Sequence, residues 1–202
     1  MNSVRTLLSE LQSFFIIFFV YVLCHGVTAL LVTPVQQMFL SEVTAFASLV
    51  YLPHGVRVLS TWLVGWRALF PLAAGAMISE LAFTSADLRE VMQPVILLSI
   101  AVGAVSALLA FLLIDLFRRG GVNADQRINW KWLIVVGAIA SVINSVGQSL
   151  VFSGLILPDH LLAVLVTYAI GDLIGLVVCM VAAMLIFRWV RLYVATNGGG
   201  PR

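Results

Sequence analysis

Four ionisable residues lie inside long apolar stretches of the chain: His54, Arg57, Glu80 and Asp172. A charge in the hydrocarbon region of a membrane is costly unless it is paired, so such residues mark functional sites or buried ion pairs. Arg57 and Asp172 lie about 14 and about 11 residues into their apolar stretches, which corresponds to depths of about 21 and about 17 Å. We predict that Arg57 pairs with Asp172 and that Glu80 is the second candidate acceptor. The pair either fixes the register of two helices or forms the floor of a ligand pocket.

The stretch YLPHGVRVLSTW, residues 51–62, places a Pro-His-Gly sequence directly before Arg57. Proline removes a backbone donor and glycine weakens a helix, so Pro53 and Gly55 predict a broken helix at this point. Irregular backbone at membrane depth is tolerated only where it faces protein or a watery cavity. We therefore expect His54 and Arg57 to line a polar cavity, for which a small anion is a suitable ligand.

Two further groups of residues favour packing or a polar pocket wall. Asn144 and Gln148 lie four residues apart in SVINSVGQSL, on one side of a predicted helix. Gly171 and Gly175 flank Asp172 at the spacing that lets membrane helices approach closely. Hydrogen bonding between helices and a packing seam would explain both groups. A pocket wall is equally compatible, because the same seam would carry Asp172 into the bundle interior.

The composition identifies an integral membrane protein. Of the 202 residues, 62% are hydrophobic and 10% are charged, whereas soluble domains carry about 25% charged residues. The apolar stretches are continuous and not alternating, which indicates helices and not barrel strands. The lipid bilayer is thus the surroundings that the chain requires, and its fold class is all-α.

Polar breaks divide the sequence into six predicted transmembrane spans that form a single membrane domain, residues 1–202. A span needs about 20 apolar residues, and only the third of these is clearly shorter. The predicted spans are residues 11–32, 43–66, 68–83, 91–117, 132–155 and 161–187.

The distribution of basic residues predicts that both termini are cytoplasmic. Cytoplasmic loops carry an excess of Lys and Arg. With the N-terminus inside, Arg89 is the one basic residue on the outer side and Arg57 lies within the membrane. The remaining nine basic residues are cytoplasmic: Arg5, Arg67, Arg118, Arg119, Arg127, Lys131, Arg188, Arg191 and Arg202.

The sequence lacks the motifs that are typical of several classes of function. The sequence shows no nucleophile beside a base, no paired catalytic carboxylates and no set of metal ligands, so we expect neither an enzyme nor a cofactor. It has no block of charge or Gly-rich phosphate loop, which argues against nucleic-acid and nucleotide binding. Cys24 and Cys179 are interpreted as small buried residues.

The segments YLPHGVRVLSTWLVGWRALFPLAAGAMISELAF and YAIGDLIGLVV together resemble the MASE1-type membrane sensor domain. The resemblance covers the second, third and sixth predicted spans. It implies a sensory module of the bacterial inner membrane, since the family is associated with histidine kinases and diguanylate cyclases. The chain departs from the family in having fewer spans, no proline after the Gly-Asp helix and no output domain. The matching residues are Pro53, Gly55, Gly65, Arg67, Phe70, Pro71, Gly75, Glu80, Gly171, Asp172 and Gly175.

Three functions therefore stand as alternatives. The first is a MASE1-like sensory or ligand-binding module that takes part in signal transduction through a membrane protein partner or a second copy. The second is a solute-binding subunit similar to the S-component of an energy-coupling-factor transporter, in which AFAS (45–48) and AAGA (73–76) would dock the partner. The third is a structural accessory subunit of a larger membrane complex.

Overall fold

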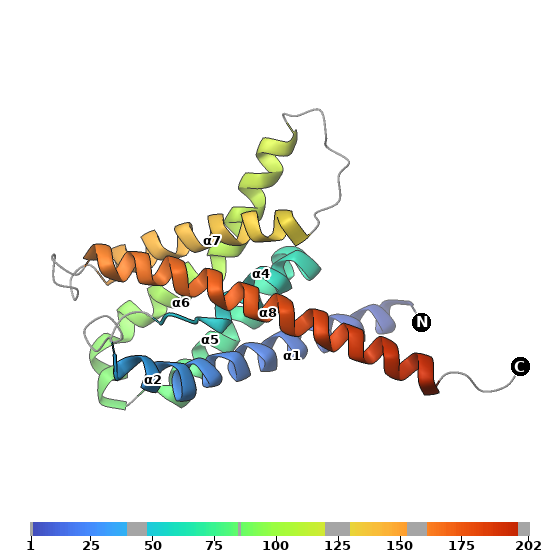
Figure 1. The fold of residues 1–202 in the computed structure, drawn as a ribbon, viewed down its shortest axis with the longest axis horizontal. Coiled ribbons are helices and arrows are strands. Elements are labelled where there is room, and N and C mark those ends of the chain that lie inside the picture. Colours follow the sequence, from blue (N-terminus) through green and yellow to red (C-terminus); the bar gives the residue numbers. More distant parts are fainter. Residues whose placement is uncertain (1, 40–47, 85, 120–129, 153–160, 198–202) are drawn as a thin grey trace, which may run out of the picture.

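Helices make up nearly all of the part of the chain that the structure describes. A computed structural model describes residues 2–39, 48–84, 86–119, 130–152 and 161–197, and these residues include no strand. The all-α prediction is confirmed for them (Figure 1). In chain order the elements are α1 (Asn2–Val27), η1 (Thr28–Val32), α2 (Thr33–Gln37), α4 (Leu52–Val64), η2 (Gly65–Ala68), α5 (Leu69–Phe83), α6 (Ala86–Arg119), α7 (Trp130–Val151) and α8 (Leu161–Asn197).

Five helical segments of the described chain are long and apolar enough to cross a membrane, which indicates a multi-pass membrane protein. The third predicted span and residues 52–66 of the second fall within one of these segments, which consists of two helices joined by a sharp turn. The five segments are Arg5–Gln37, Leu52–Phe83, Pro94–Phe117, Trp130–Val151 and Leu165–Thr196.

The sharp turn between α4 and α5 lies at Gly65. This residue has a φ of 65°, which residues with a side chain rarely adopt, and a short 3₁₀ turn follows it. The prediction of a helix break near Pro53 and Gly55 is wrong. Both residues lie in the first turn of α4, where proline is tolerated because its missing N–H would have no partner in the helix. Residues 48–51 are not helical, so the second span does not extend back to 48, and residues 43–47 lie outside the described chain.

Contacts with α1 show that α4 and α5 run in opposite directions. Arg67 pairs with Glu10 near the start of α1, and Phe83 stacks on His25 near its end, so α5 runs parallel to α1. In α4 the order is reversed, because Tyr51 contacts His25 while Arg57, further along, bonds to Tyr21. The α4–α5 segment is therefore a helical hairpin.

The last three long helices also alternate in direction. Gln148 near the end of α7 bonds to Ser99 near the start of α6, whereas Leu133 at the start of α7 and Ile114 near the end of α6 belong to the same buried cluster. α8 returns along α7, as Figure 1 shows for the orange and red ribbon beside the yellow one. The start of α1, the turn at Gly65 and the last turns of α8 thus lie towards one end of the bundle.

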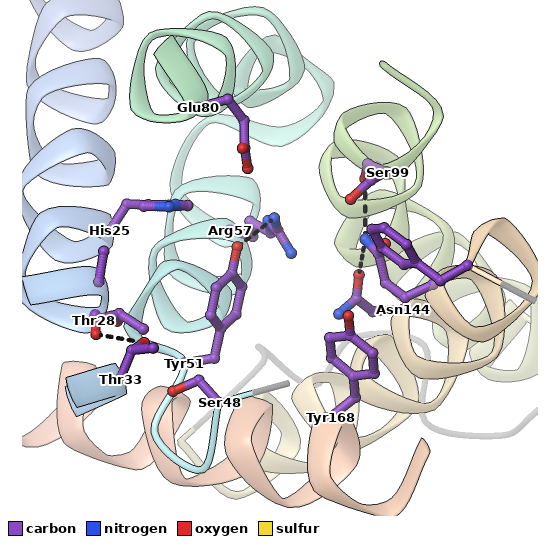
Figure 2. Close-up of a pocket in the computed structure, with 13 residues that line it drawn as sticks. His25, Thr28, Thr33, Ser48, Tyr51, Arg57, Glu80, Ser99, Asn144 and Tyr168 are labelled. Carbon is purple, nitrogen blue, oxygen red and sulfur yellow. Dashed lines mark hydrogen bonds between the residues drawn. The ribbon is translucent and has the colours of Figure 1, made fainter. Parts of the chain in front are cut away.

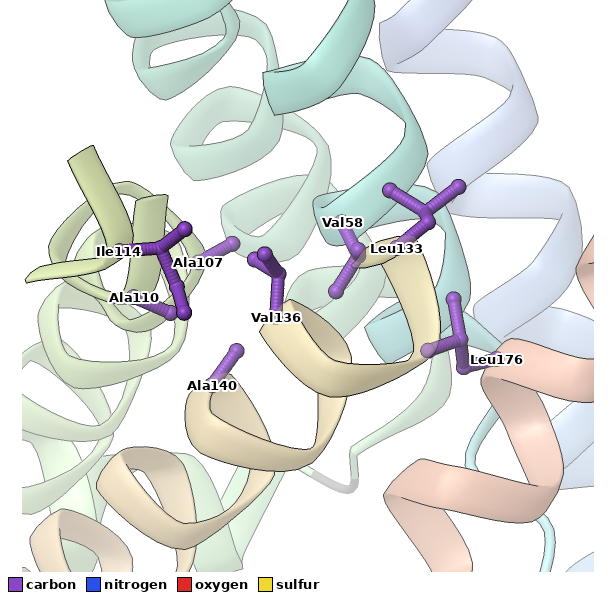
Figure 3. Close-up of a cluster of buried hydrophobic side chains, with 8 residues drawn as sticks. All are labelled: Val58, Ala107, Ala110, Ile114, Leu133, Val136, Ala140 and Leu176. Carbon is purple, nitrogen blue, oxygen red and sulfur yellow. The ribbon is translucent and has the colours of Figure 1, made fainter. Parts of the chain in front are cut away.

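Helix α4 lies at the centre, between two clusters of buried side chains. One cluster joins α4 to α6, α7 and α8 (Figure 3), and the other joins it to α1, α5 and α6. Central burial explains why α4 is the helix that holds polar side chains out of contact with lipid. The first cluster consists of Val58, Ala107, Ala110, Ile114, Leu133, Val136, Ala140 and Leu176. The second consists of Ile17, Tyr21, Val56, Ala68, Leu72, Ala76 and Ile100.

Three remaining predictions about the elements compare with the structure as follows. The fifth predicted span corresponds to α7, and its last residues, 153–155, lie outside the described chain. The sixth corresponds to α8, which continues ten residues beyond 187 to Asn197. Cys24 of α1 and Cys179 of α8 are half-buried, and their thiols contact each other, which ties the first and last helices together.

Candidate functional site

Arg57 is held in the centre of the bundle by two tyrosines. Its Nη2 donates to the hydroxyl of Tyr21 at 2.8 Å and to that of Tyr51 at 3.3 Å. Its Cζ also lies 5.6 and 5.3 Å from the centres of the same two rings, within the range of cation–π attraction. These contacts fix the plane of a guanidinium that is only 4% exposed.

The neighbouring helix α6 is shaped to accept this guanidinium. A methyl group added at Gly103 would lie 2.5 Å from Nη2 and 2.7 Å from Cζ of Arg57. Glycine is therefore required at position 103 for the arginine to keep its place. Sequence reasoning did not identify this residue, because a glycine in an apolar helix is usually explained by packing between helices.

Asp172 contacts His54 and Asn144, and not Arg57 as the sequence predicted. Asn144 donates from Nδ2 to Oδ2 of Asp172 at 2.7 Å, and the His54 Nδ1 lies 3.3 Å from the same oxygen. Arg57 and Asp172 form no direct ion pair, although they are near enough to interact electrostatically. The predicted pair is corrected to a His54–Asp172 pair on α4 and α8, with Asn144 of α7 as third member.

The contacts of His54 limit where protons can lie in this group. The Nε2 of His54 faces the carbonyl oxygen of Gly137 at 3.2 Å, so this nitrogen must be the donor and carry a proton. The contact between Nδ1 and the carboxyl oxygen of Asp172 is favourable only if a further proton lies between them, on either residue. In both arrangements the buried pair is neutral overall, which lowers the cost of burying it.

A polar cavity of about 220 Å³ opens beside Arg57 (Figure 2). Its lining residues come from α1, η1, α2, the segment before α4, and each helix from α4 to α8. Two of them, Thr33 and Ser48, lie towards the end of the bundle opposite the start of α1. The predicted site residues Arg57, Glu80, Asn144 and Gln148 are in the lining; His54 and Asp172 lie behind it, fully buried. The other lining residues are His25, Thr28, Ala29, Tyr51, Ser99, Phe152 and Tyr168.

Several buried polar atoms in the cavity lining have no hydrogen-bond partner. They are Nη1 of Arg57, Oε1 of Gln148 and Nδ1 of His25. An unpaired buried polar group costs about 1–3 kcal/mol, so a wall with several of them is suited to bind something polar. The cavity therefore presents one free guanidinium donor together with a free amide acceptor.

Glu80 faces Arg57 across the cavity. Figure 2 shows its carboxylate pointing toward the guanidinium. Its Oε2 accepts a hydrogen bond from the hydroxyl of Thr84 at 2.7 Å. Arg57 and Glu80 are not in ion-pair contact, and the acidic residue of the ion pair in this region is Asp172, which pairs with His54.

A hydrogen-bonded path connects the cavity wall with the buried pair. Gln148 donates from Nε2 to the carbonyl of Ser99 at 3.0 Å and to Oδ1 of Asn144 at 3.4 Å. Asn144 in turn donates to Asp172. A change at the cavity can thus reach α4 and α8 through side chains that contact one another.

The predicted packing residues lie where α8 meets the start of α4. The Tyr51 N–H donates to the carbonyl of Gly171 at 3.0 Å. A methyl group at Gly171 would meet the carbonyl oxygen of Ser48, and one at Gly175 would meet that of Tyr51. Gly55 likewise lies against α8, where a methyl group would lie 2.6 Å from the Cβ of Cys179. These glycines allow backbone to approach backbone.

Besides Gly103, sequence reasoning missed three tyrosines of the site: Tyr21, Tyr51 and Tyr168. Tyr21 lies four residues before His25 on α1, and this helical spacing of two polar-tipped rings was the available signal. Tyr51 and Tyr168 carry no comparable pattern. They reach the cavity only because residues 48–51 fold against α8.

No metal site is formed in the described part of the chain, where no three His, Cys, Asp or Glu side chains lie close enough to share an ion.

Comparisons with protein-family models, with curated proteins and with solved structures found no match.

Proposed function

We propose that this protein is an integral membrane module that binds a small anion in the Arg57 cavity and transmits binding to a protein partner. The single observation that carries the proposal is the Nη1 of Arg57, a buried nitrogen that has no acceptor and belongs to a residue of the cavity lining. A guanidinium held by two tyrosines is preorganised for a carboxylate or phosphate, because its plane and position are already fixed.

The size of the cavity favours a small ligand. Pockets for drug-sized molecules have volumes of about 300–1,000 Å³, and this cavity measures about 220 Å³. Below it, His54 and Asp172 are fully buried. The burial of these two polar side chains away from the cavity favours sensing or binding over conduction.

The proposed orientation places the cavity on the outer side of a bacterial inner membrane. The basic residues favour cytoplasmic ends for the chain, and α4 and α5 would each cross as one of six spans. The lining residues Thr33 and Ser48 lie towards the end of the bundle opposite the start of α1. This arrangement, and the resemblance to MASE1 sensor domains, supports a sensory role with the signal leaving on the cytoplasmic side.

The S-component alternative has less support, because the surface expected to dock its partner is used internally. In AAGA, a methyl group at Gly75 would lie 3.1 Å from Tyr21 of α1, and Ala76 belongs to a buried cluster. In AFAS, Ser48 lines the cavity and residues 45–47 lie outside the described chain. The small residues of AAGA therefore pack within this chain.

The test is ligand-dependent stability of the purified protein in micelles, with acetate, propionate and phosphate as probes at constant ionic strength. A ligand that binds only the folded state raises the melting temperature Tm. We expect at least one probe to raise Tm in the parent and to lose this effect in Arg57→Lys, which keeps the charge but lacks the planar fork.

Arg67→Lys is the matched control, because Arg67 is exposed and paired with Glu10 far from the cavity. It should respond to the probes as the parent does. If Arg57→Lys and the parent respond equally to every probe, Arg57 does not bind the anion and the proposal is wrong.

A further inference from the structure

The cavity holds two opposite charges that are kept apart. Arg57 is fixed by Tyr21 and Tyr51 on one side, and Glu80 is fixed by Thr84 on the other. In a medium of low dielectric constant, opposite charges attract strongly and would be expected to pair directly. Here each is held by its own hydrogen bonds, and both face the same space (Figure 2).

The free groups of the lining are complementary to a ligand with both an acid and a basic group. Nη1 of Arg57 is a donor that needs an acceptor, whereas Oε1 of Gln148 is an acceptor that needs a donor. The carboxylate of Glu80 is a further acceptor beside them. A simple anion would satisfy Arg57 and leave Gln148 and Glu80 unmatched, with the like charge of Glu80 opposing it.

We propose that the ligand is a small zwitterion whose acidic group binds Arg57 and whose ammonium group binds Glu80 and Gln148. This inference rests on the proposed function and names the ligand class for the same cavity. Such a ligand has no net charge, so its transfer into the membrane interior costs less than that of an anion. The shared chemistry, an acid and an amine joined by a short linker, occurs in free amino acids and in the headgroup of phosphatidylethanolamine.

The experiment compares matched pairs of soluble probes that differ only in the amino group: glycine with acetate, β-alanine with propionate and 4-aminobutyrate with butyrate. Each is added to the purified protein in lipid-free micelles, and Tm is followed by circular dichroism. We expect at least one amino acid to raise Tm more than its matched carboxylate. In Glu80→Gln this advantage should disappear, while the response to the carboxylates remains.

Glu10→Gln is the matched control, since Glu10 is exposed and lies at the other end of the bundle; it should keep the advantage of the amino acids. Should Glu80→Gln fail to fold, Glu80→Asp withdraws the carboxylate by one methylene and retains the charge. The best probe in that variant should then be a longer amino acid than in the parent.

A second arm distinguishes the two sources of the zwitterion. The protein is placed in nanodiscs of phosphatidylglycerol with or without phosphatidylethanolamine. A Glu80-dependent rise in Tm with phosphatidylethanolamine would identify a lipid headgroup as the ligand, and a response to soluble amino acids would identify a free one.

The outcomes separate this inference from the proposed function. Arg57-dependent stabilisation by carboxylates, with no advantage for any amino acid and none for phosphatidylethanolamine, overturns the zwitterion and leaves the proposed function standing. An advantage that survives in Glu80→Gln also overturns it. If neither carboxylates nor zwitterions stabilise the parent in an Arg57-dependent way, both proposals are wrong.

Discussion

Arg57 shows how a membrane helix bundle can keep a cation at its centre without an adjacent carboxylate. Two phenol groups accept its hydrogen bonds, and their rings add cation–π attraction. The carboxyl group that the chain also buries, Asp172, contacts His54 and Asn144 instead of Arg57. One nitrogen of Arg57 is thus left free to act on a ligand.

At the same scale, we expect Asn144 and Asp172 to be energetically coupled. Removing either side chain with alanine leaves the other without its 2.7 Å hydrogen bond, so the double variant should lose less stability than the sum of the single changes. Hydrogen bonds between membrane helices contribute about 0.6 kcal/mol on average and up to about 1.7 kcal/mol in such cycles. The free energy of unfolding in mixed micelles measures the coupling.

Two further pairs serve as controls for this cycle. Arg57 and Asp172 form no ion pair. Val142 lies on the same helix as Asn144 but is 58% exposed, so it should not be coupled to the buried Asp172. Both should show smaller coupling than Asn144 with Asp172. A larger coupling for Arg57 with Asp172 would restore the ion pair that the sequence predicted.

The sequence located the polar residues of the site but not their partners. Arg57, Glu80 and Asp172 could be identified because ionisable residues are rare and costly in apolar stretches. Which of them would meet could not be derived from depth alone. Depth places residues at a level in the membrane, whereas contact also depends on the rotation of each helix about its axis and on neighbours such as Tyr21.

Among the elements, the packing of α8 against residues 48–52 determines the shape of the cavity. The N–H of Tyr51 is bonded to α8, and this contact holds Ser48 and Tyr51 at the cavity wall. Gly171 and Gly175 make the approach possible because a side chain at either would collide with backbone oxygen atoms. Backbone cannot move aside as a flexible side chain can.

We therefore expect Gly171→Ala and Gly175→Ala to be strongly destabilising. Overpacking a tight interface costs about 1–3 kcal/mol and occasionally more, and a collision with backbone should lie at the upper end. The free energy of unfolding in mixed micelles is the measurement. Ile170→Ala and Ile174→Ala are the controls on α8, since these residues are 44% and 40% exposed. Equal losses for glycine and isoleucine variants would contradict the proposed role of the seam.

The sequence predicted which segments form helices more accurately than it predicted where those helices begin and end. Continuous apolar runs predicted α1, α6, α7 and α8 because each is long enough to cross a membrane. The break in the second apolar region was placed at Pro53, although proline is tolerated in the first turn of a helix. The boundary predicted between the second and third spans, at residues 66–68, lies beside the observed reversal at Gly65, where a positive φ turns the chain. A glycine inside an apolar run gives little sign of its backbone conformation.

At the scale of the whole molecule, helices of alternating direction surround a central α4. Polar groups gather where α4 meets α1, α5, α6, α7 and α8, and the large side chains on the outer faces of α1, α6 and α8 are apolar and exposed. Such a distribution suits a body surrounded by lipid with a polar cavity in its interior, which the proposed orientation places towards the outer side. The central claim is that solution reaches Arg57 through this cavity.

The most direct test is the labelling of a single cysteine at position 99 by a membrane-impermeant methanethiosulfonate reagent. Ser99 lines the cavity, whereas Ser106 lies two turns further along α6 and is fully buried away from it. With Cys24 and Cys179 replaced by serine, we predict that Ser99→Cys reacts from the outer side and that Ser106→Cys does not. If both positions react equally slowly from the outer side, solution does not enter the cavity, and the account of Arg57 as a ligand-binding residue is contradicted.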